Sequence, residues 1–265
     1  MPAYDAIVQA LSGIDPDRLQ EEKERGMTID LGFAWMKLPR GQEVGIVDVP
    51  GHERFVKNML AGVGGIDLAL LVIAANEGVM PQTTEHLAIL DLLCIPRGIV
   101  VITKKDLVDQ EWLGLVTDDN ERLIKPTIFS KSPVVPVSAV TGEGIPALVA
   151  TIDNILAQAE VKKDIGRPRL PVDRIFTIAG AGTVVTGTLI DGTFSVGEEV
   201  EVVPRGFKSR LRGLQTHKAR VDNAEPGSRV AANLVGVDTD QIHRGDVLSR
   251  PGSLAGTYMI SVQLR

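Results

Sequence analysis

Short apolar runs alternate with amphipathic segments along the first two thirds of the chain. Four runs have the length and aliphatic content of buried strands, and they cover residues 44–48, 68–75, 98–103 and 134–138. Helical spacing of apolar residues is found at residues 54–61, 83–93 and 145–159. Apolar strands that alternate with helices predict an α/β domain, in which a parallel sheet has both faces covered. Many nucleotide-binding domains have this layout.

The pattern changes near residues 161–171, where a charged, proline-containing segment cannot continue a helix. We expect a linker at residues 166–170, between a first domain at residues 1–165 and a second domain at residues 171–256. In the second domain short β-rich runs are separated by Gly, Pro and Asp, which predicts a small β-barrel. The expected strands are residues 174–178, 182–190, 199–203, 208–215, 229–234 and 247–249. Residues 257–265 read as the start of a third domain.

Composition and the length of the apolar runs argue against a membrane-spanning or secreted protein. Of the 265 residues, 44% are hydrophobic, and the longest uninterrupted apolar run, residues 68–75, is far shorter than the ~20 residues that span a bilayer. The N-terminus lacks the basic start and apolar stretch of a secretory signal, so we expect a cytoplasmic protein without membrane contacts. The single cysteine, Cys94, has apolar neighbours and is expected to be a buried thiol.

Charge is unevenly distributed along the chain. The formal net charge is −6, and residues 1–168 contain 16 basic and 24 acidic residues, whereas residues 169–265 contain 12 basic and 10 acidic residues. The second part includes a basic cluster, which consists of Arg205, Lys208, Arg210, Arg212, Lys218 and Arg220. Such a cluster either faces phosphates or forms a solvated strand face, and the charge alone does not decide between the two.

Asp48 ends a predicted strand, and the chain then turns through Pro50 and Gly51 to His52. Ligands of open α/β sheets bind beyond the carboxyl ends of the strands, where helix N-termini attract anions. At such a position an Asp can hold Mg²⁺ through water, a Gly N–H can reach a terminal phosphate and a His can orient a water molecule. An ordinary Pro-Gly turn would account for any two of these residues, but it does not account for the whole run.

A second polar segment, with Thr103, Lys104 and Asp106, closes another predicted strand. A carboxylate has two acceptors in one plane, which match the N1–H and N2–H₂ donors of guanine, and a Lys stem can pack over the base. Ser138 and Ala139 follow a later strand and supply backbone donors for the base oxygen. Each segment is weak evidence by itself, but their order along the sheet predicts a guanine site.

Together these elements resemble a translational GTPase of the elongation factor Tu type. The matching motifs are Asp-x-x-Gly-His at residues 48–52, a variant of Asn-Lys-x-Asp at residues 103–106, and Ser-Ala at residues 138–139. Residues 13–33 are similar to the switch region of selenocysteine-specific elongation factors, and Thr103 in place of Asn is also typical of that branch. The resemblance implies binding of GTP or GDP and Mg²⁺, with Thr28 and Asp48 at the metal and His52 as the catalytic residue. The complete protein would hydrolyse GTP and deliver selenocysteinyl-tRNA to the ribosome.

The resemblance extends into the second domain. Residues 173–176 and 180–187 look like the first strands of an elongation factor Tu domain 2, and residues 226–233 match a later strand. In the selenocysteine branch this domain surrounds the selenol with Asp and Arg, which implies a pocket of Asp173, Arg174 and Arg229 in this chain. The chemistry is consistent, because a selenol is ionised near neutral pH and a guanidinium is a fixed cation.

The sequence departs from the family at both ends. It contains no Gly-Lys dipeptide, so the phosphate-binding motif G-x-x-x-x-G-K-[ST] is absent, and the strand expected before the helix at residues 6–13 is missing too. We therefore expect a truncated chain that binds GTP weakly and hardly hydrolyses it. Because no third domain or RNA-binding C-terminal region follows, binding of an mRNA element is not expected. Two other readings are a non-catalytic tRNA- or ribosome-binding module and a general elongation factor Tu or initiation-factor relative.

Overall fold

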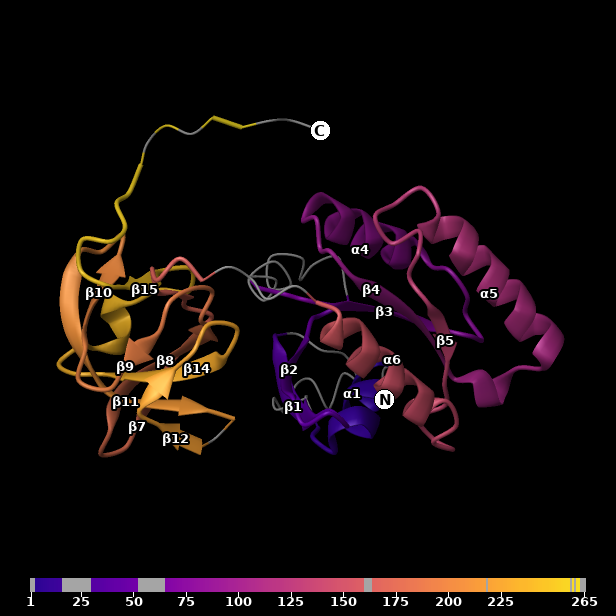
Figure 1. Ribbon diagram of the computed structural model, residues 1–265, viewed down its shortest axis with the longest axis horizontal. Helices are drawn as coiled ribbons and strands as arrows, with labels where there is room; N and C mark the ends of the chain where they lie inside the picture. The colour runs from indigo at the N-terminus through magenta and orange to yellow at the C-terminus, as the bar shows by residue number, and fades with distance from the viewer. Residues whose placement is uncertain are drawn as a thin grey trace. The chain divides into compact units, whose positions relative to one another are not determined.

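The chain forms two compact units, Met1–Val161 and Lys162–Arg265 (Figure 1). The computed structural model describes residues 3–15, 30–51, 65–159, 164–217, 219–257, 259 and 261–262. Within these ranges no helix has the length and apolar character needed to cross a membrane. We call the first unit the α/β domain and the second unit the β domain.

The α/β domain contains a parallel sheet, an antiparallel strand pair and several helices. Its helices are α1 (Ala3–Ser12), α4 (Pro81–Leu92), α5 (Gln110–Ile124) and α6 (Ile145–Ala157), and a short 3₁₀ turn, η2, spans Lys105–Leu107. Its strands are β1 (Gly32–Lys37), β2 (Glu43–Asp48), β3 (Ala69–Ala74), β4 (Gly98–Thr103) and β5 (Val134–Pro136). Strands β3, β4 and β5 pair in parallel in that order, and β1 pairs with β2 in antiparallel fashion.

Strand β4 is the centre of the parallel sheet, and all its residues are buried. Its side chains alternate between two cores. Ile99 and Val101 pack in a cluster with residues of α1 and α6, whereas Val100 and Ile102 pack in a cluster with residues of α4 and α5. Helices therefore cover both faces of the sheet (Figure 1). This confirms the α/β layout that the unbroken apolar strands predict.

The β1-β2 pair shares a core with the parallel sheet. Met36 of β1 and the following Leu38 belong to the same buried cluster as Ile7 of α1 and Val101 of β4. Within the described ranges, however, β2 forms no ladder with β3. The sheet of this domain thus consists of two hydrogen-bonded pieces held together by apolar packing.

Most of the expected elements of this domain are present, with bounds that differ by one or a few residues. The strand expected at residues 134–138 ends at Pro136, and the helix expected at residues 145–159 ends at Ala157. The helix expected at residues 54–61 lies outside the described residues. The structure corrects the prediction for Cys94, which is exposed. Its apolar neighbour Leu92 is 67% exposed, because the chain turns at the end of α4 and returns to the core only at Ile95.

The β domain is a curled antiparallel sheet. Its strands are β6 (Arg169–Pro171), β7 (Arg174–Ile178), β8 (Gly182–Thr188), β9 (Phe194–Ser195), β10 (Glu199–Val203), β11 (Phe207–Thr216), β12 (Ala219–Val221), β13 (Asn223–Ala224), β14 (Arg229–Leu234) and β15 (Val247–Ser249), with a 3₁₀ turn, η3, at Thr239–Gln241. The main sheet has the order β6-β15-β10-β11-β14-β8-β7, with β12 beside β11, and β9 pairs with β13. Alternate side chains such as Leu211, Val230 and Leu248 fill one apolar core inside the curl. The prediction of a small barrel-like β domain is confirmed.

The segment expected as a linker, residues 166–170, overlaps the first strand of the β domain. Arg169 and Leu170 belong to β6, where Leu170 is completely buried and faces Leu248 of β15. Leu170 and Val172 thus place this segment in the core of the β domain. The same strand needs Gly187 on β8, because a Cβ at that position would lie 2.1 Å from the carbonyl oxygen of Pro171.

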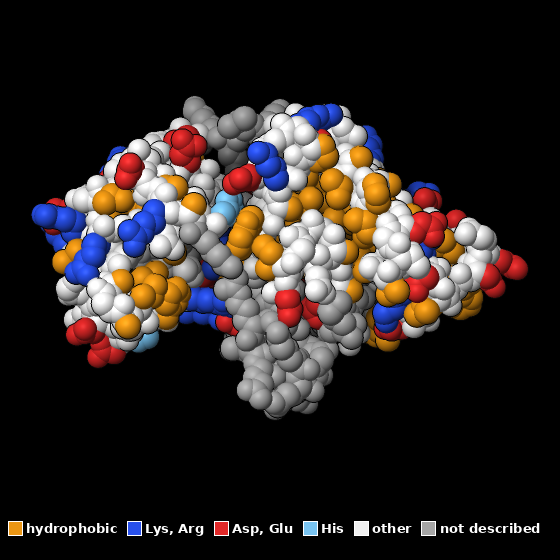
Figure 2. All heavy atoms as spheres, turned by 90° about the horizontal axis from the view of Figure 1, so that it is seen from below, with side chains coloured by type: hydrophobic (Ala, Val, Ile, Leu, Met, Phe, Trp, Pro, Cys, Tyr) orange, Lys and Arg blue, Asp and Glu red, His pale blue; other side chains and the backbone are white. Residues whose placement is uncertain are grey.

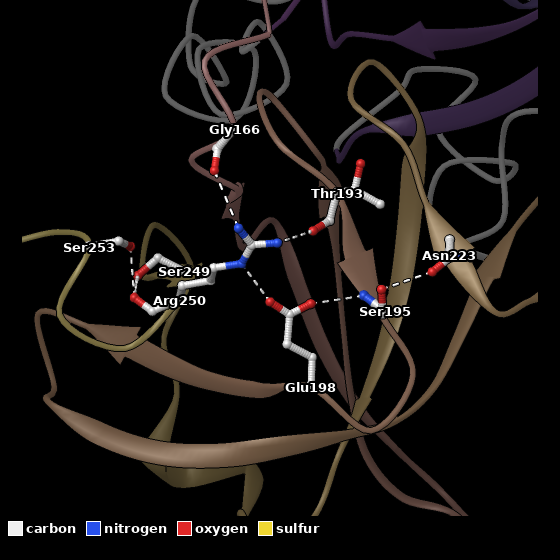
Figure 3. Close-up of polar contacts among 8 residues, drawn as sticks. All are labelled: Gly166, Thr193, Ser195, Glu198, Asn223, Ser249, Arg250 and Ser253. Atoms are coloured by element: carbon white, nitrogen blue, oxygen red, sulfur yellow. Dashed lines mark hydrogen bonds and ion pairs between the residues drawn. The ribbon is translucent and has the colours of Figure 1, made fainter.

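Arg250 connects the segments where the chain enters and leaves the β domain (Figure 3). Its Nε lies 2.6 Å from Oε1 of Glu198, and its two terminal nitrogens donate to the carbonyl oxygens of Gly166 (3.4 Å) and Thr193 (3.2 Å). The other carboxylate oxygen of Glu198 accepts the N–H of Ser195 at 3.0 Å. The Arg250 guanidinium, near the end of this domain, therefore links Gly166 near its start to Thr193 and Glu198.

Candidate functional site

The carboxyl ends of β4 and β5 carry most of the residues predicted to recognise a guanine base. Thr103, the last residue of β4, is 2% exposed, and its hydroxyl donates to the carbonyl oxygen of Ile73 on β3 at 3.3 Å. The side chain at the position where most GTPases have Asn therefore ties β4 to β3. The prediction placed Thr103 among the nucleotide-binding residues, and in the structure its hydroxyl is engaged by the protein.

Lys104 and Asp106 form the loop that follows. Lys104 has left-handed backbone angles (φ 56°, ψ 32°), and its Nζ lies 3.0 Å from Oε1 of Glu77 in the loop after β3. Asp106 sits in the turn η2 and is exposed to solvent. An exposed carboxylate held on a short turn is accessible to the N–H donors of a base.

Ser138 and Ala139 lie in the neighbouring loop after β5. Ser138 is fully buried, its N–H donates to the carbonyl oxygen of Glu143 at 2.8 Å, and its Oγ accepts the N–H of Thr141 at 3.1 Å. Serine thus folds the loop back on itself and leaves Ala139 at its turn. Its role is to shape the loop, as a buried hydroxyl with local backbone partners does in turns.

The two loops are joined directly. The N–H of Lys105 donates to the carbonyl oxygen of Val137 at 3.3 Å, and Nζ of Lys105 lies 2.6 Å from Oε1 of Glu143. The structure therefore brings Thr103, Lys104 and Asp106 together with Ser138 and Ala139, as the order of the strands predicts. The sequence analysis missed Lys105, Glu143 and Glu77, whose pairing depends on loop geometry.

Asp48 ends β2, in the other piece of the sheet, and Pro50 and Gly51 follow it. Asp48 is 6% exposed and faces Gly32 of β1 across the ladder, and Pro50 is buried as well. His52 and Thr28, predicted as the catalytic residue and a metal ligand, lie outside the described residues. The described part of the chain contains no cluster of three or more His, Cys, Asp or Glu side chains around a metal position. A carboxylate such as Asp48 has the oxygen chemistry that Mg²⁺ prefers.

Asp173 and Arg229 form a buried bidentate ion pair in the β domain. Nη1 of Arg229 lies 2.6 Å from Oδ2 of Asp173, and Nη2 donates to Oδ1 at 2.8 Å. Thr186 on β8 completes the group, because its hydroxyl donates to Oδ1 of Asp173 at 2.7 Å and accepts from Nη2 of Arg229 at 3.2 Å. Arg174 is half-buried on β7 and faces Thr186 in the ladder. The three residues predicted for the aminoacyl pocket thus lie around one threonine that the sequence analysis did not identify.

Three members of the basic cluster of the β domain have acidic neighbours, and Lys218 lies outside the described residues. Lys208 and Arg210 on β11 face Glu201 and Glu199 on β10, and Arg205 lies 3.2 Å from the carboxylate of Asp246. On the face of the molecule in Figure 2, Lys and Arg side chains are interspersed with Asp and Glu side chains. This arrangement favours a solvated strand face over a continuous phosphate-binding surface.

Two titratable groups outside these loops have shifted pKa values. Burial lowers the pKa of His86 on α4, against a smaller opposing effect of the Glu85 carboxylate. The pKa of Asp164 is lowered by its interaction with the Asp191 side chain and by hydrogen bonds from the N–H groups of Gly166 and Gly192. Neither group lies in the predicted base-binding loops.

The fold is an α/β domain with two joined loops at the carboxyl ends of β4 and β5, followed by a β domain. Residues 5–158 match the family described as elongation factor Tu GTP binding domain, and residues 182–249 match elongation factor Tu domain 2. The chain therefore belongs to the elongation factor Tu family of GTP-binding proteins.

Curated relatives include selenocysteine-specific elongation factors from two bacteria. The protein from Desulfomicrobium baculatum is 48% identical over 259 residues, which are 98% of this chain and 41% of the relative. The protein from Escherichia coli (strain K12) is 42% identical over 91% of this chain and 39% of the relative. The chain thus spans about two fifths of the length of these relatives.

Solved structures give the same result. The crystal structure of a bacterial selenocysteine-specific elongation factor, EF-Sec, is similar with a TM-score of 0.89 and 39% identity, over 93% of this chain and 42% of that chain. Elongation factor SelB from Methanococcus maripaludis, in complex with the GTP analogue GppNHp, has a TM-score of 0.83 and 36% identity, over 92% of this chain and 51% of that chain. The resemblance stated from the motifs is confirmed at the level of the family, and the roles of individual site residues stay predictions.

Proposed function

We propose that this chain is the GTP-binding and aminoacyl-binding part of a selenocysteine-specific elongation factor. The observation that carries the proposal is the direct joining of the loops of residues 103–106 and 138–143 at the carboxyl ends of β4 and β5. The names of the relatives support the selenocysteine branch. The complete factor would hydrolyse GTP and deliver selenocysteinyl-tRNA to the ribosome in the cytoplasm.

In this proposal the base is recognised by residues of both loops. The Asp106 carboxylate accepts from N1–H and N2–H₂ of guanine, the Lys104 stem covers the ring, and the Ala139 N–H faces the base oxygen. Thr103 and Ser138 hold these groups in place through their buried hydroxyls.

Asp48, Pro50 and Gly51 would serve the phosphate end. Asp48 and Thr28 are assigned to Mg²⁺, Gly51 to the terminal phosphate and His52 to the attacking water. Bound Mg²⁺ would supply charge neutralisation at the phosphates. Oxygen ligands at Asp48 and Thr28 fit the preference of this ion.

We assign Asp173, Arg174 and Arg229 to the pocket for the selenocysteinyl group. The Asp173 carboxylate and the Thr186 hydroxyl fix the plane of the Arg229 guanidinium. A cation held in a fixed orientation favours an ionised selenol over a neutral hydroxyl. This difference would distinguish selenocysteinyl-tRNA from seryl-tRNA.

The 265 residues contain no G-x-x-x-x-G-K-[ST] sequence. In proteins of this class that loop supplies backbone N–H groups and a Lys to the phosphates. We therefore propose that the chain as given binds GTP weakly and hydrolyses it very slowly, while its base contacts keep the preference for guanine over adenine.

The proposal is tested by calorimetric titration of the chain with GTP, GDP and ATP in the presence of Mg²⁺. The comparison protein carries, before residue 1, the strand and phosphate-binding loop of a selenocysteine-specific relative. Weak binding by the chain and tight, guanine-selective binding by the comparison protein are expected. Equal affinity for ATP and GTP in the comparison protein would contradict guanine recognition. Salt-sensitive tRNA binding that ignores both guanine nucleotides would instead favour a non-catalytic RNA-binding module.

A further inference from the structure

The loop of residues 103–106 is held from two sides by ion pairs. Lys104 pairs with Glu77, which precedes α4, at 3.0 Å, and Lys105 pairs with Glu143, which precedes α6, at 2.6 Å. The two lysines are consecutive, yet their carboxylate partners come from different loops of the sheet edge. The base-binding loop therefore depends on both of its neighbours for its position.

Glu143 is connected to the second base-binding loop as well as to the first. Its carbonyl oxygen accepts the N–H of Ser138 at 2.8 Å, and its own N–H donates to Oγ1 of Thr141 at 3.3 Å. Its side chain meanwhile holds Lys105, whose N–H donates to the carbonyl oxygen of Val137 at 3.3 Å. A displacement of Glu143 would therefore move both loops.

The burial of the pair is asymmetric. The Lys105 side chain is 16% exposed, whereas the Glu143 side chain is 66% exposed. The lysine stem is thus fixed against the protein, and its partner reaches it from the solvent side. A largely exposed carboxylate contributes little to global stability. Such a contact is better suited to setting local geometry than to holding the fold.

We propose that Lys105 and Glu143 are a positioning pair for guanine selectivity, an inference that rests on the proposed function. Guanine presents its oxygen and its N–H donors along one edge, so Asp106 and Ala139 must stand at a fixed separation. Asp106 directly follows Lys105, and Ala139 lies between Ser138 and Glu143 in the chain. The pair sets the separation of the two recognition groups without touching the base.

The test uses Glu143→Gln, which keeps the size of the side chain and removes its charge. Dissociation constants for GDP and IDP are measured by calorimetry, because inosine lacks the 2-amino group that Asp106 would contact. We expect the preference for GDP over IDP to fall by about three- to tenfold. The charge-exchanged variant, Lys105→Glu with Glu143→Lys, should recover part of it. The matched control is Asp119→Asn, which removes the exposed Arg122–Asp119 pair of α5 and should leave the preference unchanged.

Amide hydrogen exchange provides a readout that needs no nucleotide. In Glu143→Gln the N–H groups of Lys105, Ser138 and Thr141, which donate to acceptors within the two loops, should exchange about tenfold faster, with unchanged exchange in the centre of β4. Unchanged exchange in both loops, or an unchanged GDP preference, would overturn the positioning role. If the unmodified chain binds neither GDP nor IDP, both dissociation constants are measured in the comparison protein that carries the phosphate-binding loop, and an absence of binding there would contradict the proposed function. Exchange then decides the positioning role by itself, since faster exchange in both loops supports it and equal exchange refutes it.

Discussion

The guanidinium of Arg229 and the carboxylate of Asp173 meet in two hydrogen bonds of 2.6 and 2.8 Å, although the residues are 56 positions apart in the chain. The side chains are 19% and 7% exposed. A bidentate arrangement of this kind adds geometric specificity to the charge attraction. The pair fixes the orientation of the guanidinium at the pocket proposed for the aminoacyl group.

Removal of one member should destabilise the β domain, because the other charge then stays buried. We expect Arg229→Ala to lower the free energy of unfolding by about 3 kcal/mol, and Asp173→Ala by a similar amount. The double variant should lose about 1–3 kcal/mol less than the sum of the two single variants. Urea denaturation of the three variants measures this coupling. Strict additivity would mean that the pair does not act as a unit.

The same arginine should matter most for the selenocysteinyl form of the tRNA. A selenolate is anionic and a seryl hydroxyl is neutral, so Arg229→Ala is expected to weaken binding of selenocysteinyl-tRNA about tenfold and of seryl-tRNA less than about threefold. Filter-binding titrations with both tRNAs give the two ratios. The control is Arg212→Ala, which removes an exposed side chain that donates to the carbonyl oxygen of Ala181 at 2.9 Å and should affect both forms equally. Equal losses for Arg229→Ala would contradict the selenocysteine assignment.

The strands were predictable because each has a strong local signal. The aliphatic run of β4 and the alternating pattern of β14 match the structure residue for residue at 98–103 and 229–234. The order of these strands was enough to place Asp106 and Ala139 at one sheet edge, because parallel strands end on the same side. The local pattern gave a wrong prediction of burial for Cys94, because its apolar neighbours at the end of α4 are exposed to solvent.

The side-chain partners were not predictable from local pattern. Lys105 and Glu143 are 38 positions apart, and Thr186 meets Arg229 across 43 positions. Such pairs depend on strand register and loop conformation, which only the assembled sheet determines. Sequence motifs therefore identify the predicted site residues, whereas only the folded structure identifies the side chains that orient them.

Gly187 provides a test of how closely β8 approaches β6. Its added Cβ would lie 2.1 Å from the carbonyl oxygen of Pro171, and a backbone atom cannot move aside easily. We expect Gly187→Ala to lower the free energy of unfolding by about 2–3 kcal/mol. The matched control is Gly213→Ala on β11, where nothing lies within 4 Å of the added Cβ. Comparable unfolding midpoints in urea for the two variants would contradict the close approach.

Asp164 anchors the start of the β domain. Its Oδ1 accepts the N–H groups of Gly166 at 2.8 Å and Gly192 at 2.9 Å, and it also interacts with the side chain of Asp191. Asp191 in turn accepts the N–H of Ile165 at 2.9 Å. Arg250 and Arg169 are the cations at this junction, since Arg250 acts on Asp164 and Arg169 lies 3.4 Å from Asp191.

These contacts make the anchor sensitive to acid. The pKa of Asp164 is lowered from its ordinary value of 3.8, first by the hydrogen bond with Asp191 and then by those from Gly166 and Gly192. A lowered pKa means that the carboxylate stabilises the folded state above the unfolded pKa, and that this contribution is lost as the pH falls through the folded pKa. We therefore expect the Asp164 carboxyl, followed by NMR, to titrate below pH 3.8, and Arg250→Ala to move its midpoint upward because a neighbouring cation is removed. Arg122→Ala in the α/β domain should leave it unchanged, and a midpoint above 3.8 in the unmodified chain would show that the anchor does not form.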